Sequence, residues 1–252
     1  MGHDDAQPAE TQVVRTALDG STLYGFETVM DRGLPATASA CVAGASDYSS
    51  DRLMKRCMDL VIILLTMPLL LPALLLVAIA VRSTSPGPVF FSHRRICRNG
   101  AFFSMWKFRT MCVDSAEVLD RYLARHPEAR AEWKKTHKLR HDPRVTPVGG
   151  FLRKYSLDEL PQAWNVLTGR MSLVGPRPIV AAEVEKYREH FACYCRVKPG
   201  VTGLWQVSGR STLSYETRVK LDCEYVESRS LLWDLRILAV TFRSVVNKDG
   251  AY

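Results

Sequence analysis

The 252-residue sequence lacks the markers of several common classes of protein. Its seven scattered cysteines show no CxxC spacing, so neither a disulfide framework nor a zinc site is predicted, and a reducing cytoplasm fits best. It has no Walker-type glycine loop, no GxSxG elbow and no internal repeat, which excludes P-loop enzymes, serine hydrolases with that elbow and solenoids. No basic segment followed by an apolar core lies near the first residue, so no signal peptide is expected.

Positive charge, in contrast, is abundant. The net charge of +8 indicates an anionic partner, such as a nucleic acid, a phosphorylated substrate or an acidic membrane. We find no recognition-helix motif, so no nucleic-acid partner is expected. His126, His137 and His141 lack the spacing of metal ligands. Residues 1–50 are polar and aperiodic, and we expect a disordered tail without a functional site there.

Residues 60–81 form an apolar run long enough to cross a bilayer. Basic residues flank it on both sides, whereas a spanning helix keeps them mostly on the cytoplasmic side. Pro68 and Pro72 lie near its middle, where each removes a backbone donor and can kink or break a helix. Two interpretations of residues 51–85 stay open: a re-entrant helix that enters and leaves by one face, or a spanning helix with a tolerated kink. The basic flanks are Arg52, Lys55, Arg56, Arg82, His93, Arg94, Arg95 and Arg98.

Residues 89–96 and 101–109 are predicted to form two strands joined by a hairpin turn at Asn99-Gly100, after a turn at residues 85–88. The alternation of a strand places Lys107 and Arg109 on the same face. They form either a basic edge that resists aggregation or a clamp for phosphate.

The rest of the chain is predicted to be largely helical. Residues 114–140 indicate a long polar helix that begins at Asp114 and is interrupted by Pro127, and residues 201–207 indicate a strand or extended loop. Residues 215–225 form a further helix. Ser230 caps a last amphipathic helix, which either lies at a membrane interface or packs in the core.

Two adjacent carboxylates, Asp158 and Glu159, stand out in this basic chain. Neighbouring acids repel each other unless a cation lies beside them. Ser156 and Glu159 match a helix capping box, and Asp158 is an alternative N-cap, so helix capping and chemistry are both open interpretations. The helix that follows is expected to end at Gly169.

Several arginines occupy positions suited to anion binding. Arg177 lies between Pro176 and Pro178, which restrict its backbone and pre-organise the guanidinium, although a simple turn has the same pattern. Arg210 follows a glycine that allows close approach of a ligand, and Arg153 lies five residues before Asp158.

At this point the sequence over about residues 52–246 resembles the bacterial sugar transferases, also called monotopic polyprenyl-phosphate phosphoglycosyl transferases. The resemblance depends on six ordered motifs, any one of which would be weak alone. They are KRCMD at 55–59, PGPVF at 86–90, KFRTM at 107–111, SLDELPQ at 156–162, VGPRP at 174–178 and KPGVTGLWQVSGR at 198–210.

The resemblance implies an α+β, mainly helical fold, with a re-entrant membrane helix over 51–85, a cytoplasmic domain over 86–246 and a short tail over 247–252. It implies transfer of a sugar-1-phosphate from a UDP-sugar, UDP-galactose or UDP-glucose, to undecaprenyl phosphate at the bacterial inner membrane. Asp158 is then the nucleophile that carries the phosphosugar, and Glu159, with Asp158, holds Mg²⁺, or Mn²⁺ as an alternative. The phosphate-binding positions are Lys107, Arg109, Arg153, Arg177 and Arg210.

Residues 137–146 and the length resemble galactose-1-phosphate transferases of exopolysaccharide synthesis, of the minimal type. Many members have Ser-Pro at the helix break, whereas this chain has Leu71-Pro72 and an extra Pro68, so which proline makes the bend stays open. The competing hypothesis is a non-catalytic membrane scaffold of polysaccharide assembly, against which the intact Asp158 and Glu159 speak. The sequence also leaves open whether the chain forms a homo-oligomer.

Overall fold

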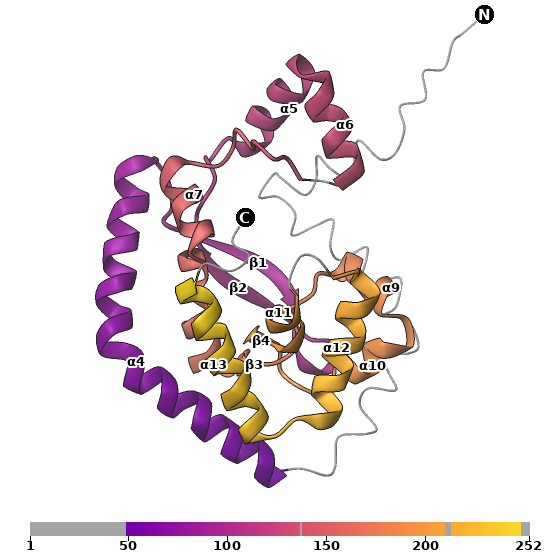
Figure 1. Cartoon of the computed structure of the whole chain (residues 1–252). Coiled ribbons are helices and arrows are strands. Elements are labelled where there is room, and N and C mark those ends of the chain that lie inside the picture. The colour runs from indigo at the N-terminus through magenta and orange to yellow at the C-terminus, as the bar shows by residue number, and fades with distance from the viewer. Residues whose placement is uncertain (1–48, 137, 210–212, 248–252) are drawn as a thin grey trace, which may run out of the picture.

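The computed structural model describes residues 49–136, 138–209 and 213–247, and the expected tail over 1–50 lies almost entirely outside them. The described chain is mostly helical and contains two small sheets (Figure 1). The strands are β1 (Phe90–Ile96), β2 (Phe102–Phe108), β3 (Ser172–Val174) and β4 (Gly200–Thr202). The helices are α4 (Ser49–Thr84), α5 (Ser115–Arg125), α6 (Pro127–Thr136), α7 (Pro147–Lys154), α8 (Gln162–Leu167), α9 (Val184–Tyr187), α10 (Phe191–Tyr194), α11 (Leu204–Ser208), α12 (Tyr215–Ser228) and α13 (Leu231–Asn247).

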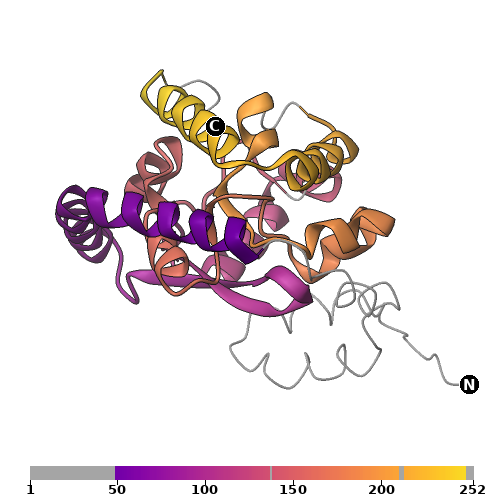
Figure 2. The same ribbon diagram turned by 90° about the horizontal axis from the view of Figure 1, so that it is seen from below.

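The apolar run forms α4, a 36-residue helix that bends in its middle (Figure 1). Pro68 and Pro72 lie inside it and cannot donate a hydrogen bond to the preceding turn. In Figure 2 one half is seen nearly end-on and the other runs across the view, so the halves point in different directions. Among the described residues, α4 is the one helix long and apolar enough to cross a membrane. Its leucines at 64, 65, 69, 71, 75 and 76 are all more than half exposed.

The predicted hairpin is confirmed. β1 and β2 pair antiparallel, from Phe90 opposite Phe108 to Ile96 opposite Phe102. Asn99 and Gly100 at the turn have φ values of 62° and 73°, the left-handed conformation that Asn-Gly tolerates well. One face of β2 packs on α4 and α8, where its buried side chains meet Ile63 and Val166.

The predicted long polar helix over 114–140 is two helices, α5 and α6. Pro127 begins α6, and the preceding His126 is extended with φ −127° and ψ 92°, as expected before a proline. Asp114 occupies the N-cap position of α5, but its side chain makes no capping hydrogen bond. The pair projects from the rest of the molecule (Figure 1).

The C-terminal part is built on the parallel pair of β3 and β4, which lies under α11, α12 and α13. A Cβ atom at Gly200 would collide with the backbone of Gly175, so the two segments approach as closely as they do only because position 200 is glycine. The expectation of a strand or extended loop over 201–207 is only partly met, because β4 ends at Thr202 and α11 begins at Leu204.

The predicted helix over 215–225 is confirmed by α12, and Ser230 accepts a hydrogen bond from the backbone N–H of Trp233 at the start of α13. The two faces of α13 differ in burial. Ile237 is buried in a core cluster with Tyr225 and Val226, which confirms packing for one face. On the other face Leu232, Leu235 and Phe242 are 64%, 49% and 73% exposed.

Candidate active site

The carboxylate pair lies in a short 3₁₀ turn, Leu157–Glu159, between α7 and α8. Ser156 adopts the left-handed conformation with φ 55°, which reverses the chain at the end of α7. The predicted capping box is wrong, because the Ser156 side chain makes no capping hydrogen bond, and α8 begins only at Gln162. The predicted end at Gly169 is confirmed by its φ of 75°. Asp158 is buried and Glu159 is partly exposed.

Lys107 of β2 joins the two carboxylates. Its Nζ lies 2.6 Å from Glu159 Oε1 and 3.6 Å from Asp158 Oδ2. The cation therefore offsets the repulsion between adjacent acids. The chemical interpretation of the pair, rather than helix capping, fits this geometry.

Asn165 on α8 fixes the distance between α8 and β2. Its Oδ1 accepts from the backbone N–H of Trp106 at 3.0 Å, and its Nδ2 donates to the carbonyl of Ser104 at 2.8 Å. The side chain is 3% exposed. Asn165 thus attaches α8 to the strand that carries Lys107. This role of Asn165 could not be predicted, because an asparagine inside a short helix gives no signal of a hydrogen bond to a strand about sixty residues earlier.

Arg153 at the end of α7 lies on the same side of the molecule. Its Nε donates to Thr110 Oγ1 at 2.9 Å, and its charge acts on Asp158. Thr110 is held by α7, since its carbonyl accepts from the N–H of Thr146 at 3.0 Å. The structure therefore brings together Lys107, Arg153, Asp158 and Glu159, four of the residues selected from the sequence.

The ionisation of Asp158 depends on these cations. Burial raises the pKa of Asp158 above its ordinary value, Lys107 and Arg153 lower it, and Glu159 raises it. A buried carboxylate can act as a nucleophile only while it is ionised. Lys107 and Arg153 are thus the groups that favour the ionised form of Asp158.

Arg177 lies on an extended segment after β3, and its guanidinium carbon is 5.7 Å from the centroid of the Trp205 ring. A second arginine, Arg95 of β1, was counted in the sequence only as a membrane-flanking charge. It donates to the carbonyl of Pro178 at 3.0 Å, and its pKa is lowered by burial and by the nearby charge of Arg177. Arg95 also lies 3.8 Å from the carboxylate of Glu183, so its ion-pair partner is Glu183.

Two further residues that were predicted to bind phosphate, Arg109 and Arg210, are not seen beside Asp158 and Glu159. Arg109 is 8% exposed, and its guanidinium donates to the carbonyls of Ser85 and Pro86 at the end of α4. The expectation that Lys107 and Arg109 share a face fails because β2 ends at Phe108, where the alternation stops. Arg210 lies outside the described residues.

An apolar pocket of about 400 Å³ is lined in part by the residues that follow the carboxylates in the sequence. One wall is the bend of α4, and the others come from the hairpin and from residues 160–167, which directly follow Glu159. The lining residues include Leu70, Leu71, Leu74, Phe90, Trp106 and Trp164.

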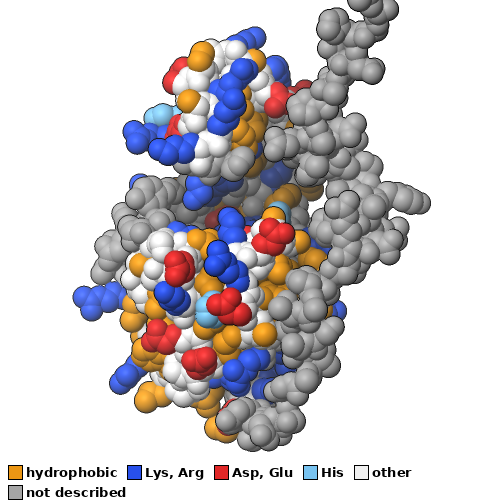
Figure 3. Space-filling view, turned by 90° about the vertical axis from the view of Figure 1, so that its right-hand side faces the viewer, with side chains coloured by type: hydrophobic (Ala, Val, Ile, Leu, Met, Phe, Trp, Pro, Cys, Tyr) orange, Lys and Arg blue, Asp and Glu red, His pale blue; other side chains and the backbone are white. Residues whose placement is uncertain are grey.

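In the space-filling view, Lys and Arg side chains gather around the hollow between the α5–α6 pair and the rest of the molecule (Figure 3).

The described residues contain no group of three or more His, Cys, Asp or Glu side chains placed to hold a metal ion. Asp158 and Glu159 nevertheless supply two hard oxygen ligands side by side. Mg²⁺ is commonly bound by one or two carboxylates together with substrate phosphates and water. The residues present therefore fit an ion that arrives with a phosphorylated substrate.

Comparison of the sequence with known proteins shows the family to which the chain belongs. The model of the family described as bacterial sugar transferase matches residues 50–248, so the chain belongs to the bacterial sugar transferase family. It is 48% identical over 203 residues to an undecaprenyl-phosphate galactose phosphotransferase of Salmonella typhimurium, a match that covers 81% of this chain and 42% of that protein. It is 51% identical over 203 residues to a UDP-galactose-lipid carrier transferase of Erwinia amylovora, again over 81% of this chain and 42% of the relative.

The chain thus spans less than half the length of these relatives. A shorter relative, the exopolysaccharide production protein ExoY of Sinorhizobium fredii, is 48% identical over 198 residues, which are 79% of this chain and 88% of that protein. The family membership predicted from the six motifs is confirmed.

Proposed function

We propose that this protein transfers a sugar-1-phosphate from UDP-galactose or UDP-glucose to undecaprenyl phosphate and releases UMP. The observation that carries the proposal is a buried Asp158 beside Glu159, with Lys107 Nζ within 3.6 Å of both carboxylates, in a chain of this family. The names of two relatives support the class of reaction, since they describe transfer of galactose phosphate to undecaprenyl phosphate and of galactose to a lipid carrier.

The proposed reaction has two displacements at phosphorus. A carboxylate oxygen of Asp158 attacks the phosphorus that bears the sugar, and the bond from that phosphorus to the bridging oxygen breaks, so UMP departs with the electron pair. An oxygen of undecaprenyl phosphate then attacks the same phosphorus. The bond to Asp158 breaks, the carboxylate is regenerated, and undecaprenyl diphosphate-sugar forms.

The cations around Asp158 have defined parts in this scheme. Lys107 and Arg153 favour the ionised form of Asp158, against the effect of its burial, and offset the negative charge that accumulates on the phosphoryl oxygens. We assign the diphosphate of the donor to Arg177, which precedes the Pro178 carbonyl that accepts from Arg95. Asp158 and Glu159 would hold Mg²⁺, or Mn²⁺, which when bound neutralises phosphate charge as a Lewis acid.

The lipid acceptor is assigned to the apolar pocket. Its lining is almost entirely hydrocarbon and aromatic, and it lies between the bend of α4 and the residues that follow Glu159. A polyprenyl chain fits such a surface, because burial of apolar area is favourable at about 25 cal/mol per Å². We further propose that α4 is re-entrant in the inner membrane and that the catalytic domain faces the cytoplasm, which is supported by the bend and by basic residues on both flanks.

The test is the Asp158→Asn variant, supplied with UDP-galactose and UDP-glucose in turn. UMP release is expected to fall by about 10³-fold or more, because an amide is a poor nucleophile at phosphorus. Wild-type protein incubated with donor alone should carry a phosphosugar on the peptide containing Asp158, seen by mass spectrometry. The matched control is Asp120→Asn on the exposed face of α5. Normal turnover by Asp158→Asn, or product formation without any adduct, would show that Asp158 is not the nucleophile.

A further inference from the structure

A second cavity lies away from the carboxylate pair, around the start of α4. It has a volume of about 330 Å³ and is bounded by the first turns of α4, the turn after β1, the segment before β4 and the junction of α12 and α13. Seven basic side chains and three acidic ones line it. The proposed reaction uses none of them.

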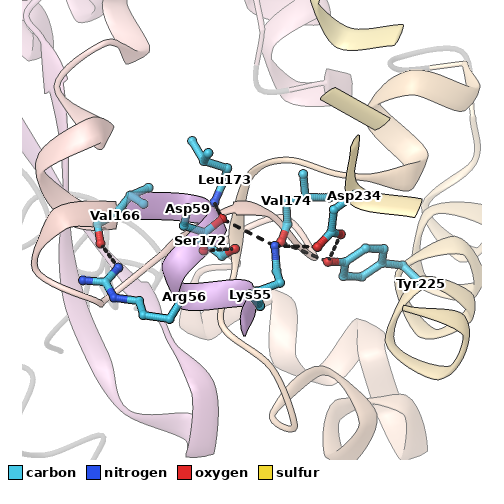
Figure 4. Close-up of polar contacts among 9 residues, drawn as sticks. All are labelled: Lys55, Arg56, Asp59, Val166, Ser172, Leu173, Val174, Tyr225 and Asp234. Atoms are coloured by element: carbon cyan, nitrogen blue, oxygen red, sulfur yellow. Dashed lines mark hydrogen bonds and ion pairs between the residues drawn. The ribbon is translucent and has the colours of Figure 1, made fainter. Parts of the chain in front are cut away.

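The acidic side chains on its floor are already engaged (Figure 4). Asp234 is fully buried; its Oδ2 lies 2.8 Å from Lys55 Nζ, and its Oδ1 accepts from the hydroxyl of Tyr225 at 2.7 Å. Asp59, 2% exposed, accepts from Ser172 Oγ at 2.7 Å and lies 3.5 Å from the same Lys55. Among the described residues, the ion pairs of these two carboxylates are both made to Lys55, and neither makes an ion pair with another cation of the cavity.

Two of those cations, Arg56 and Lys198, come together at one place, and Arg98 lines the same cavity. A Cβ built on Gly169 would lie 3.4 Å from Lys198 Nζ and 3.7 Å from Arg56 Nη2, so the two cationic groups converge on that glycine. Arg98 is close enough, with Arg56, to lower the pKa of Lys198, after the larger lowering that burial causes. Within the described part of the chain, Lys198 and Arg98 have no carboxylate within ion-pair distance.

Arg56 is anchored but retains donors. Its guanidinium donates to the carbonyls of Val166 and Leu167 at the end of α8, as Figure 4 shows for Val166. A guanidinium has five N–H groups, so donors remain for a ligand. Because Arg56 is fixed by the backbone, less conformational entropy is lost when an anion binds.

We propose that Arg56, Arg98 and Lys198 bind a phosphate group in this cavity, at a site separate from the one at Asp158. Convergent, half-buried cations without a carboxylate in ion-pair contact are an arrangement that stabilises a compact anion. The cavity opens where α4 begins, so the phosphate is carried either by a lipid headgroup or by a small soluble phosphate. The assignment stands on these residues alone and does not depend on the proposed reaction.

The experiment measures protection of Lys198. The whole protein in phosphatidylcholine nanodiscs is treated briefly with an amine-acylating reagent, and modification of Lys198 is divided by that of the exposed Lys134 in the same digest. Bound phosphate should lower this ratio about tenfold. Protection by added inorganic phosphate or pyrophosphate identifies a soluble ligand. Protection only when phosphatidylglycerol replaces part of the phosphatidylcholine identifies a lipid headgroup.

The Arg98→Gln variant should lose about tenfold in affinity for the protecting probe, equivalent to about 1.4 kcal/mol. Arg98→Lys retains the charge and should retain most of the protection, which separates loss of the anion from loss of the fold. Asp158→Asn should remain fully protected. An unchanged ratio with every probe, unchanged protection in Arg98→Gln, or loss of protection in Asp158→Asn would overturn the proposal.

Discussion

Two buried carboxyl groups, Asp158 and Asp222, differ in what surrounds them. Asp158 faces Lys107 at 3.6 Å and responds to Arg153, so cations oppose the effect of its burial. Asp222, 2% exposed on α12, accepts from the hydroxyl of Tyr187 at 2.7 Å. Burial raises the pKa of Asp222 to about 8, although the hydrogen bond from Tyr187 and the nearby Arg177 lower it. At neutral pH Asp222 is thus mainly protonated, in contact with the hydroxyl of Tyr187.

The raised pKa of Asp222 predicts a pH-dependent stability. The unfolded protein loses this proton near pH 4 and the folded protein near pH 8, so the stabilisation from protonated Asp222 decreases as pH rises between these values. Relative to the Asp222→Asn variant, the wild-type free energy of unfolding should fall by about 1.4 kcal/mol per pH unit between about pH 5 and pH 8. Denaturant unfolding at a series of pH values measures it, with Asp120→Asn expected to follow wild type. Parallel curves for wild type and Asp222→Asn would contradict the assignment.

The sequence predicted four members of the site because they stand out in chemical character: adjacent acids in a basic chain, and lysine and arginine in motifs of the family. It did not predict where Arg109 lies, because whether a strand continues for one more residue is decided by the packing at its end. Arg95 was missed because one arginine among many in a basic segment looks like any other surface charge.

At the scale of elements, the site depends on α8 lying against β2. Its six residues are too few for a stable isolated helix, so contacts with neighbours hold it in place. Asn165 supplies two hydrogen bonds to the backbone of β2 at residues 104 and 106. Lys107 is the next residue of the strand, so the orientation of α8 determines the distance from Lys107 to the carboxylates.

Replacing Asn165 by Ala should therefore impair both stability and activity. It leaves a strand N–H and a carbonyl without these partners, which we expect to cost about 1–3 kcal/mol in the free energy of unfolding. UMP release should fall more than stability alone accounts for, because Lys107 is no longer held beside Asp158. The test compares kcat at a temperature where each protein is fully folded. Thr168→Ala on the exposed end of α8 is the control, and a normal kcat for folded Asn165→Ala would show that the contact does not position Lys107.

The bend of α4 predicts an effect on topology. Straight, a helix of 36 residues would extend about 54 Å, well beyond the roughly 30 Å hydrocarbon core. With the bend, a membrane-impermeant thiol reagent outside intact cells should spare both the exposed Cys57 and a cysteine introduced at the exposed Ser83. In the variant Pro68→Ala/Pro72→Ala, we expect one of the two cysteines to become labelled. Labelling of one cysteine in the protein with both prolines intact would mean a spanning helix.

Elements with strong local signals were predictable: Asn-Gly for the hairpin, the serine cap for α13 and the apolar run for α4. The segment at 201–207 was not, because its short apolar residues suit a strand and a helix equally. Its structure depends on close approach to Gly175, because a Cβ at Gly200 or at Gly203, where the chain passes from β4 into α11, would collide with the Gly175 backbone.

At the scale of the whole molecule, exposed apolar side chains are concentrated on two elements far apart in sequence. The leucines of α4 and the outer face of α13 together contain many of the exposed large apolar residues. Soluble proteins rarely expose contiguous apolar patches of this kind, and such patches mark contact with a membrane or a partner. The sequence predicted this surface for α4 but left it open for α13, because an apolar stripe on a helix does not reveal which face is covered.

If the outer face of α13 contacts lipid, a polarity-sensitive fluorophore there should detect it. We expect a dye on Phe242→Cys, in a background with Cys57→Ser, to shift its emission to shorter wavelength in nanodiscs, as in an apolar solvent. The same dye on Ala124→Cys of the projecting α5 should report water. Equal emission from both positions would place the outer face of α13 in solvent.

The ion pair between Lys55 and Asp234 joins the first described helix to the last. During synthesis the ribosome delivers the apolar segment long before α13 exists. Until then Asp59 is the carboxylate available to Lys55, and the wall of the cavity that α13 provides is missing. The first turns of α4 can therefore reach their full set of ion pairs only after α13 has been synthesised, so the earliest described helix is completed by the latest one.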